Sequence, residues 1–255
     1  MSNALAAADV VTQFVCRQGD RCLVLSHRLQ QCITHAPQLE EELAIANIAL
    51  DLLGQARSLY TYAAGRIGPD LTEDDLAFGR DADEFWPPAL VEQPNTDFAL
   101  VMGRQLLHDL WADELWRAMR SSTDPTLAAI AGKAAKETAY HLLHASTWVV
   151  TLGDSTPEAH DRMSAALTAL WPFVDELFST DDLVASVAAL GVAPDPATLR
   201  RSWDARLDAI LEDATLTRPT GQARPPTGRD RCSDDLRAVI DELHELHAQH
   251  PGARW

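Results

Sequence analysis

Three long stretches of this chain have the apolar repeat of amphipathic helices together with start and stop signals, and this limits the possible folds most strongly. They cover residues 36–68, 95–121 and 125–152. The first has Glu40, Glu41 and Glu42 in its opening turn and closes at Gly68, as helix termini prefer. At about 1.5 Å per residue, each spans roughly 40 Å or more. Because no segment alternates apolar and polar residues as a strand does, we predict an all-α helical bundle.

Shorter helices are expected around these three, at 20–35, 156–179, 181–190, 195–214 and in the C-terminal segment after Ser233. Residues 1–18 are expected to form a flexible N-terminal arm before a single domain over 19–255. Residues 215–232, TLTRPTGQARPPTGRDRC, are rich in Pro and Gly and predict a loop before the last helix. Because this loop is basic in an acidic chain, it is either a docking segment or a solvated loop.

Charge and composition exclude several classes of function. A formal net charge of −17 argues against binding to nucleic acid, whose phosphates need basic partners. The four cysteines include no CxxC pair and are expected to be reduced thiols, as in cytosolic proteins. No signal peptide is recognisable, and no window approaches the roughly 20 apolar residues of a membrane span. We therefore expect a cytoplasmic protein that binds neither nucleic acid nor a membrane.

The 36–68 helix is apolar on two sides, which predicts a central element that is buried on both sides. One stripe is formed by Leu39, Leu43, Ala46, Leu50 and Leu53. The other is formed by Ile45, Ile48, Leu52, Leu59 and Tyr62, with Gln55 among them.

Polar residues interrupt the inward-facing stripes of all three long helices at mid-length. They are Gln55 on the first helix, Asp109 on the second, and Thr138 with His141 on the third. The motif KETAYHLLH at 136–144 also places Glu137, His141 and His144 at i, i+4 and i+7, on one face of a helix. Since carboxylates and imidazoles at mid-bundle are how ferritin-like proteins hold a di-iron site, this region is a candidate metal centre.

Four segments, in the same order and spacing, resemble the C-subunit family of bacterial phenylacetyl-CoA epoxidases, the ring-1,2 monooxygenases. They read APQLEEELAIANIALDLLGQARSLYTYAAGRIG, DDLAFGRD, LVEQPNTDFA and KAAKETAYHLLHASTW followed by LG. The resemblance covers about residues 20–255. It implies a ferritin-like fold with additional C-terminal helices. It also implies a partner, the catalytic A subunit of the same fold, which holds the di-iron cofactor and binds the CoA thioester.

The A subunit has the patterns DExGH and KEExxH, and this chain departs from both. DLLGQ at 51–55 places Leu52 and Gln55 where the first pattern has its ligand Glu and His. KETAYH at 136–141 places Thr138 where the second has a ligand Glu, and keeps His141. Asp109 takes the position of a lone carboxylate on a third helix. The resemblance therefore implies a degenerate pocket, with no metal, no cofactor and no catalytic residue in this chain.

A fourth contribution from the 20–35 helix is not identifiable, because no Asp or Glu lies between Arg21 and His35. Asp109 and His141 can hydrogen-bond to each other, and a single weakly held metal near them is an alternative. Glu137 is offset by about 100° from the neighbouring ligand position, so we expect it to reach a partner at the helix edge or solvent.

Three functions remain open from the sequence. The first, which the resemblance favours, is a non-catalytic structural subunit that pairs with and stabilises the catalytic A subunit, and also self-associates into a larger oligomer. The second is a divergent ferritin-like metal oxidase that uses Asp109 and His141. The third is a metal-free adaptor bundle with no fixed enzyme partner.

Overall fold

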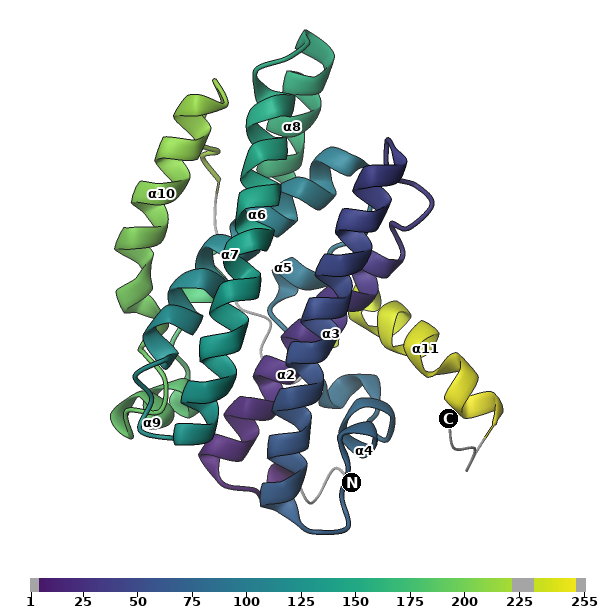
Figure 1. Cartoon of the computed structure of the whole chain (residues 1–255), viewed down its shortest axis with the longest axis vertical. Helices are drawn as coiled ribbons and strands as arrows, with labels where there is room; N and C mark the ends of the chain where they lie inside the picture. Colours follow the sequence, from purple (N-terminus) through teal and green to yellow (C-terminus); the bar gives the residue numbers. More distant parts are fainter. Residues whose placement is uncertain (1–4, 222–231, 251–255) are drawn as a thin grey trace.

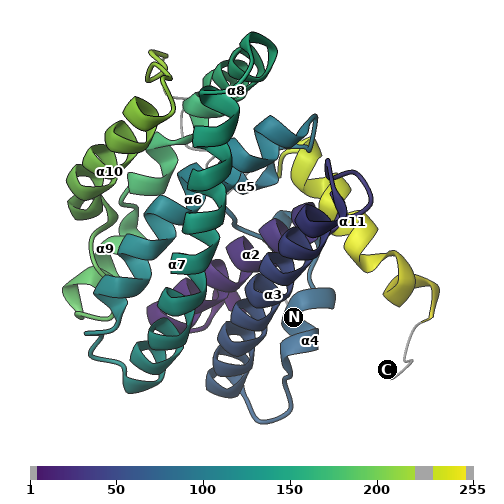
Figure 2. The same cartoon turned by 45° about the horizontal axis from the view of Figure 1, so that its top comes forward.

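The chain forms a bundle of long helices with shorter helices on two of its sides (Figure 1). The computed structural model describes residues 5–221 and 232–250, and every regular element in these two ranges is helical. The bundle is built from α2 (Val10–Gln30), α3 (Leu39–Ile67), α6 (Phe98–Met119) and α7 (Pro125–Gly153). The helices α3 and α7 lie side by side in the front layer, with α2 and α6 behind them (Figure 2).

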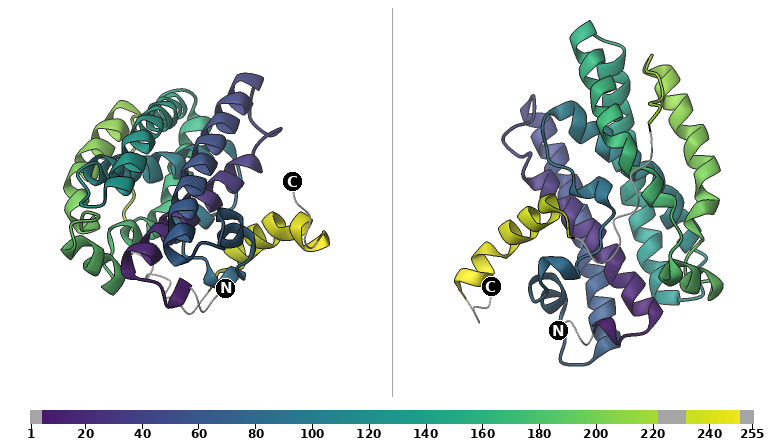
Figure 3. Two further views of the ribbon diagram at one scale, coloured as in Figure 1. Left: turned by 60° about the horizontal axis from the view of Figure 1, so that its bottom comes forward. Right: turned by 180° about the vertical axis from the view of Figure 1, so that it is seen from behind.

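The other elements connect or cover this bundle. They are α4 (Glu73–Phe78), η1 (Ala82–Glu84), α5 (Ala89–Glu92), α8 (Pro157–Leu170), η2 (Trp171–Phe173), η3 (Asp175–Phe178), α9 (Asp182–Ala189), η4 (Pro196–Leu199), α10 (Arg200–Asp213) and α11 (Asp234–Gln249). The helix α10 packs along α6 and α7, and α11 packs on the opposite side, against α2 and α4 (Figure 3). The buried indole of Trp203 on α10 donates to the Leu107 carbonyl oxygen on α6.

The expectation of a flexible arm over residues 1–18 is wrong for residues 10–18, which form the first half of α2. Asp9 caps this helix by accepting a hydrogen bond from the Thr12 amide, and Phe14 and Val15 are buried. The sequence conceals the helix because the polar run Arg17–Arg21 interrupts its apolar repeat. Residues 1–4 lie outside the described part of the chain.

Most other helix predictions agree with the structure, and the exceptions have local causes. Asp124 caps α7 with Pro125 in the first turn, and Ser233 caps α11, as the sequence predicts. The predicted helix over 156–179 instead ends at Leu170 and continues as two short 3₁₀ turns. Pro172 lacks the amide that a continuing α-helix requires. Of the predicted 215–232 loop, residues 215–221 form no regular element, and residues 222–231 fall outside the described ranges.

The prediction that α3 is buried on both sides is wrong for one of its two stripes. The inner stripe is buried, with Ile45, Ile48 and Leu52 each 1% exposed. The outer stripe faces away from the bundle, since Leu39 is 66% exposed and Leu50 is 62% exposed. No second layer of this chain covers that side of α3 in the described ranges (Figure 1). Among the described residues, no helix is both long and apolar enough to cross a membrane.

Candidate functional site

The five positions that the sequence singles out lie inside the bundle, at mid-length of three helices. They are Leu52 and Gln55 on α3, Asp109 on α6, and Thr138 and His141 on α7, and each is at most 3% exposed. Their burial agrees with the inward direction predicted from spacing. A buried polar side chain that lacks a partner costs about 1–3 kcal/mol, so the partners of these groups decide what the pocket can do.

Asp109 and His141 do not hydrogen-bond to each other, contrary to one expectation from the sequence. Asp109 accepts from Gln105 Nε2 at 3.0 and 2.8 Å, and its Oδ1 lies 2.8 Å from His108 Nδ1. His141 Nε2 lies 3.0 Å from Asp51 Oδ2 at the edge of the bundle. Burial lowers the pKa of His141, while Asp51 opposes that shift. Both polar groups are therefore held by neighbours that the sequence analysis did not assign to them.

A buried arginine from α2 completes the Asp109 network. Arg21 Nη1 lies 2.6 Å from His108 Nε2, and the guanidinium also lies 5.1 Å from the Trp111 ring and 5.3 Å from the Trp116 ring. Since a guanidinium only donates, His108 Nε2 must accept, and its Nδ1–H donates to Asp109. Burial and the Arg21 charge both lower the pKa of His108. A neutral imidazole thus bridges a fixed cation and a carboxyl group.

The residues of this pocket do not fit a di-iron centre. Two iron ions need several carboxylates and at least two imidazoles around one space. In the described ranges, no group of three or more His, Cys, Asp or Glu side chains is arranged to hold a metal ion. Burial raises the pKa of Asp109 well above its ordinary range, although Gln105 and Arg21 oppose the rise. The Arg21 cation adds repulsion against a divalent ion, and Leu52 offers no ligand atom.

Side chains of the motif KETAYHLLH on α7 form a row of hydrogen bonds to the antiparallel helix α3. Its three aligned side chains on α7 each reach a different residue of α3: Glu137 accepts from Gln55 Nε2 at 3.0 Å, His141 donates to Asp51 at 3.0 Å, and His144 donates to Glu41 at 2.8 Å. Glu137 also pairs with Lys133 at 3.1 Å. Glu137, which the sequence was expected to direct to a partner at the helix edge or to solvent, thus reaches Gln55, a buried position of the pocket. The aligned spacing joins α7 to α3 instead of converging on one ion.

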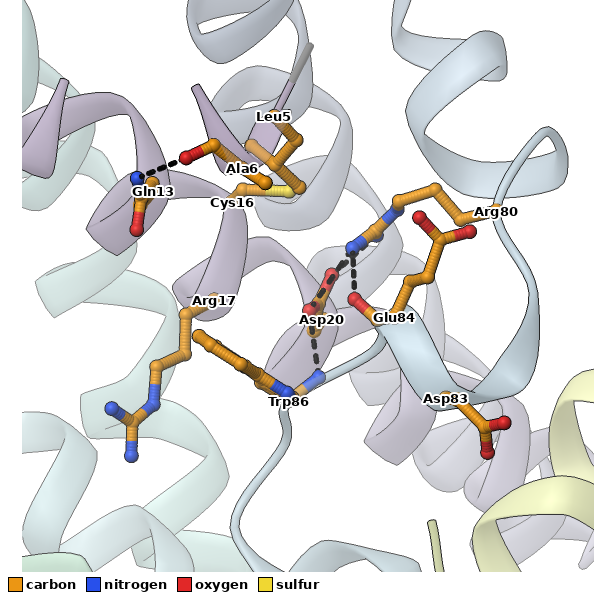
Figure 4. A pocket seen from close by; sticks show the side chains of 10 residues that line it. All are labelled: Leu5, Ala6, Gln13, Cys16, Arg17, Asp20, Arg80, Asp83, Glu84 and Trp86. Carbon is orange, nitrogen blue, oxygen red and sulfur yellow. Dashed lines mark hydrogen bonds and ion pairs between the residues drawn. The ribbon is translucent and has the colours of Figure 1, made fainter. Parts of the chain in front are cut away.

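A second buried charge network lies between α2 and the α4–α5 region, and the sequence analysis missed it. Asp20 accepts from Arg80 and from the Trp86 backbone amide at 2.9 Å (Figure 4). It also accepts from the Tyr60 hydroxyl at 2.6 Å. Asp20 is 2% exposed and Arg80 is 3% exposed. Burial and Asp20 raise the pKa of Tyr60. Asp20 is therefore a mid-helix carboxylate of α2, but it is already paired.

The signal for Asp20 is present in the sequence, and the predicted helix boundary excludes it. The predicted helix begins at residue 20, which makes Asp20 an end residue, whereas in the structure it lies in the central part of Val10–Gln30. A cavity of about 200 Å³ adjoins this ion pair and is lined by Cys16, Arg17 and Trp86, among others (Figure 4). A cavity of this size next to a satisfied ion pair defines no reaction on its own.

Two comparisons show which known proteins this chain is similar to. The family described as "Phenylacetic acid catabolic protein" matches residues 2–255. The chain is also 42% identical over 246 residues to the C subunit of 1,2-phenylacetyl-CoA epoxidase from Escherichia coli (strain K12). That match covers 96% of this chain and 99% of its relative. The predicted all-α, ferritin-like bundle with additional C-terminal helices is thereby confirmed.

Proposed function

This chain belongs to the phenylacetic acid catabolic protein family, and from that membership we propose that it is the non-catalytic structural subunit of a phenylacetyl-CoA 1,2-epoxidase. In this proposal it pairs with the catalytic A subunit, which holds the di-iron cofactor. The support is the 42% identity to the C subunit of such an epoxidase over nearly the whole chain. The complex would work in the cytoplasm, in aerobic breakdown of phenylacetate, and would include further copies of the chain.

The single observation that carries the non-catalytic role is the Arg21–His108–Asp109 network at mid-bundle. A ferritin-like enzyme needs this space for metal ligands. Here the Arg21 cation lies against His108, and Gln105 and His108 donate hydrogen bonds to the Asp109 carboxyl group. In this proposal protein hydrogen bonds take the place of metal ligands at mid-bundle, and the bundle serves as a folded partner alone.

In this role the chemistry belongs to the partner. The partner's di-iron centre uses oxygen and reducing equivalents to convert the aromatic ring of the CoA thioester to an epoxide. This chain contributes no electron, proton or metal ligand. Its residues keep a rigid bundle folded and present a surface to the catalytic subunit, which it stabilises.

The test is a count of iron in three samples. We would purify this chain alone, the catalytic subunit alone and the complex, load each anaerobically with excess ferrous iron, desalt them and measure iron per chain. We expect about zero in this chain and unchanged iron per catalytic subunit in the complex. Near two irons in this chain would overturn the proposal in favour of a metal oxidase.

A second arm distinguishes a subunit from a free adaptor. Phenylacetyl-CoA epoxidation is measured for the catalytic subunit with and without this chain, and with the Arg21→Met variant. We expect activity to depend on the wild-type chain, and the variant to change complex stability without changing the metal content. Full activity of the catalytic subunit without this chain would favour the adaptor function.

A further inference from the structure

A small buried cavity lies where α2, α6 and the segment from η3 to η4 meet. It encloses about 40 Å³ and is lined by side chains from all three, among them Arg21 of α2, Trp111 of α6 and Glu176 of η3. Since a single water molecule needs roughly 10–15 Å³, the cavity has room for a small ligand but not for a substrate-sized molecule. The polar atoms in its wall decide what it can hold.

Two side chains of this wall have a buried N–H group without an acceptor in the described part of the chain. They are Arg21, through Nη2, and Trp111, through Nε1. Arg21 is 1% exposed and Trp111 is 5% exposed, so bulk solvent does not supply the acceptor. Because buried polar groups nearly always have a hydrogen-bond partner, these two donors indicate that a ligand with an acceptor atom binds in the cavity.

The rest of the Arg21 guanidinium is already in contact with the protein. Its Nη1 donates to His108 Nε2 at 2.6 Å, and its Nε donates to Gln18 Oε1 at 3.2 Å. The indole rings of Trp111 and Trp116 lie against it, with their centroids 5.1 and 5.3 Å from Cζ. Among the described residues, the Nη2 edge is therefore the part of Arg21 that is left for a ligand.

The wall also offers acceptor atoms to a ligand that donates. Gln18 lines the cavity, and its Oε1 has a second lone pair beside the one that Arg21 Nε uses. Glu176 accepts from the Ala89 backbone amide at 2.9 Å, and a carboxylate has about four acceptor sites. A water molecule both accepts and donates hydrogen bonds, so it matches this mixture of donors and acceptors.

A small anion is the alternative ligand, since Arg21 is a buried cation and buried charges are normally paired. The Glu176 carboxylate in the same wall opposes an anion by repulsion. The Asp109 carboxyl group is also joined to Arg21 through the His108 ring. A neutral ligand that solvates Arg21 therefore fits the charges around the cavity better than a further anion does.

We propose that this cavity is an internal hydration site, in which water accepts hydrogen bonds from Arg21 Nη2 and Trp111 Nε1 and joins α2 to α6. The buried Arg21 cation is then solvated inside the protein, while its Nη1 group holds the network of His108 and Asp109. This inference does not depend on the proposed function, because it concerns only the packing of this chain.

Trp116 provides an internal control. Its Nε1 is also buried and without an acceptor in the described ranges, and its ring lies about as close to Arg21 as the ring of Trp111 does. Trp116 is not, however, one of the described residues that line the cavity. If water entered the core all around Arg21, both indole N–H groups would contact it, whereas a hydration site in this cavity contacts that of Trp111 alone.

The experiment detects water at each indole group of the nitrogen-15-labelled, full-length chain by nuclear magnetic resonance. Laboratory-frame and rotating-frame Overhauser spectra are recorded between the water signal and the indole Nε1–H signals. A long-lived bound water gives cross peaks of opposite sign in the two spectra, whereas exchange of the N–H hydrogen gives the same sign. Trp111→Phe and Trp116→Phe form a matched pair that assigns the two signals. Triple-resonance spectra of the wild-type chain assign them if either variant fails to fold.

We expect cross peaks of opposite sign at Trp111 and none at Trp116. Absence of cross peaks at Trp111, or equal cross peaks at both indoles, would overturn the hydration site. Replacing gluconate by about 200 mM chloride at constant ionic strength should leave the Trp111 signal unchanged. A saturable shift of that signal, with the Trp116 signal unmoved, would show that the cavity binds an anion and would also overturn the inference.

Discussion

Replacing either partner of the buried Asp20–Arg80 pair should destabilise this protein more than any exposed charge change. The pair joins α2 to the segment between α4 and η1, with Asp20 2% and Arg80 3% exposed. Burial alone would lower the pKa of Arg80, but Asp20 raises it above its ordinary value. Removing Asp20 takes away the largest influence that raises the Arg80 pKa against the lowering effect of burial, but a guanidinium is not deprotonated in proteins, so Arg80 stays charged. An uncompensated buried charge of this kind costs about 3–5 kcal/mol.

The magnitude can be read from urea unfolding followed by circular dichroism at 222 nm and pH 7.5. With an m-value of roughly 3 kcal/mol/M, Asp20→Leu should lower the unfolding midpoint by about 1–1.7 M, and Arg80→Met should do the same. The double variant leaves no unpaired charge, so its loss should be at least 2 kcal/mol smaller than the sum of the single losses. The double variant still loses stability because the Tyr60 hydroxyl and the Trp86 amide are left without their partner, at about 1–3 kcal/mol each.

An exposed ion pair provides the control. Glu158 and Arg162 pair at i, i+4 on α8 with side chains 75% and 60% exposed, and such pairs contribute about 0.3–0.5 kcal/mol. Glu158→Gln should thus leave the midpoint nearly unchanged. The reasoning is refuted if Asp20→Leu costs less than about 1 kcal/mol, or if the double variant shows simple additivity.

Two further predictions concern close packing and thiol chemistry. Gly19→Ala should destabilise the protein by about 1–3 kcal/mol in the same urea assay, because an added Cβ would lie 2.5 Å from the Tyr60 ring, whereas Gly65→Ala, with nothing within 4 Å, should not. Burial raises the pKa of Cys16 to about 12 from 9.0, so iodoacetamide at pH 8 should modify native Cys16 at least about a thousandfold more slowly than the unfolded chain. Because the Cys16 thiol loses its proton at lower pH in the unfolded chain than in the folded protein, its contribution to stability should fall as pH rises above about 9. Mass spectrometry of the native protein would contradict this reasoning if it showed that iodoacetamide modifies Cys16 before the half-buried Cys232.

Much of the fold could be predicted because its signals are local. The start of α7 at Asp124-Pro125 and the start of α11 after Ser233 depend only on a few adjacent residues, whose capping preferences are intrinsic. The inward direction of Leu52 and His141 likewise follows from helical spacing alone. These predictions needed no knowledge of neighbouring helices.

The candidate site was predicted in its positions but not in its contacts. Spacing placed Asp109 in the core, but its partner His108 is adjacent in sequence and would be expected to point elsewhere on the helix. Arg21 lies 87 residues away from His108, and no pattern within α2 marks it as buried. The residue type alone does not tell whether an arginine is buried or solvated, because that depends on the side chains that pack against it.

The sequence by itself determined the helical class, the three long helices and the loss of the ligand pattern at Leu52 and Thr138, because each depends on residue type and local spacing. Only the tertiary structure decided that Asp20 and Arg21 are buried and paired, and that Leu50 is exposed. Whether a side chain is buried depends on which other residues pack against it. For this bundle, those neighbours come from helices far apart in the chain.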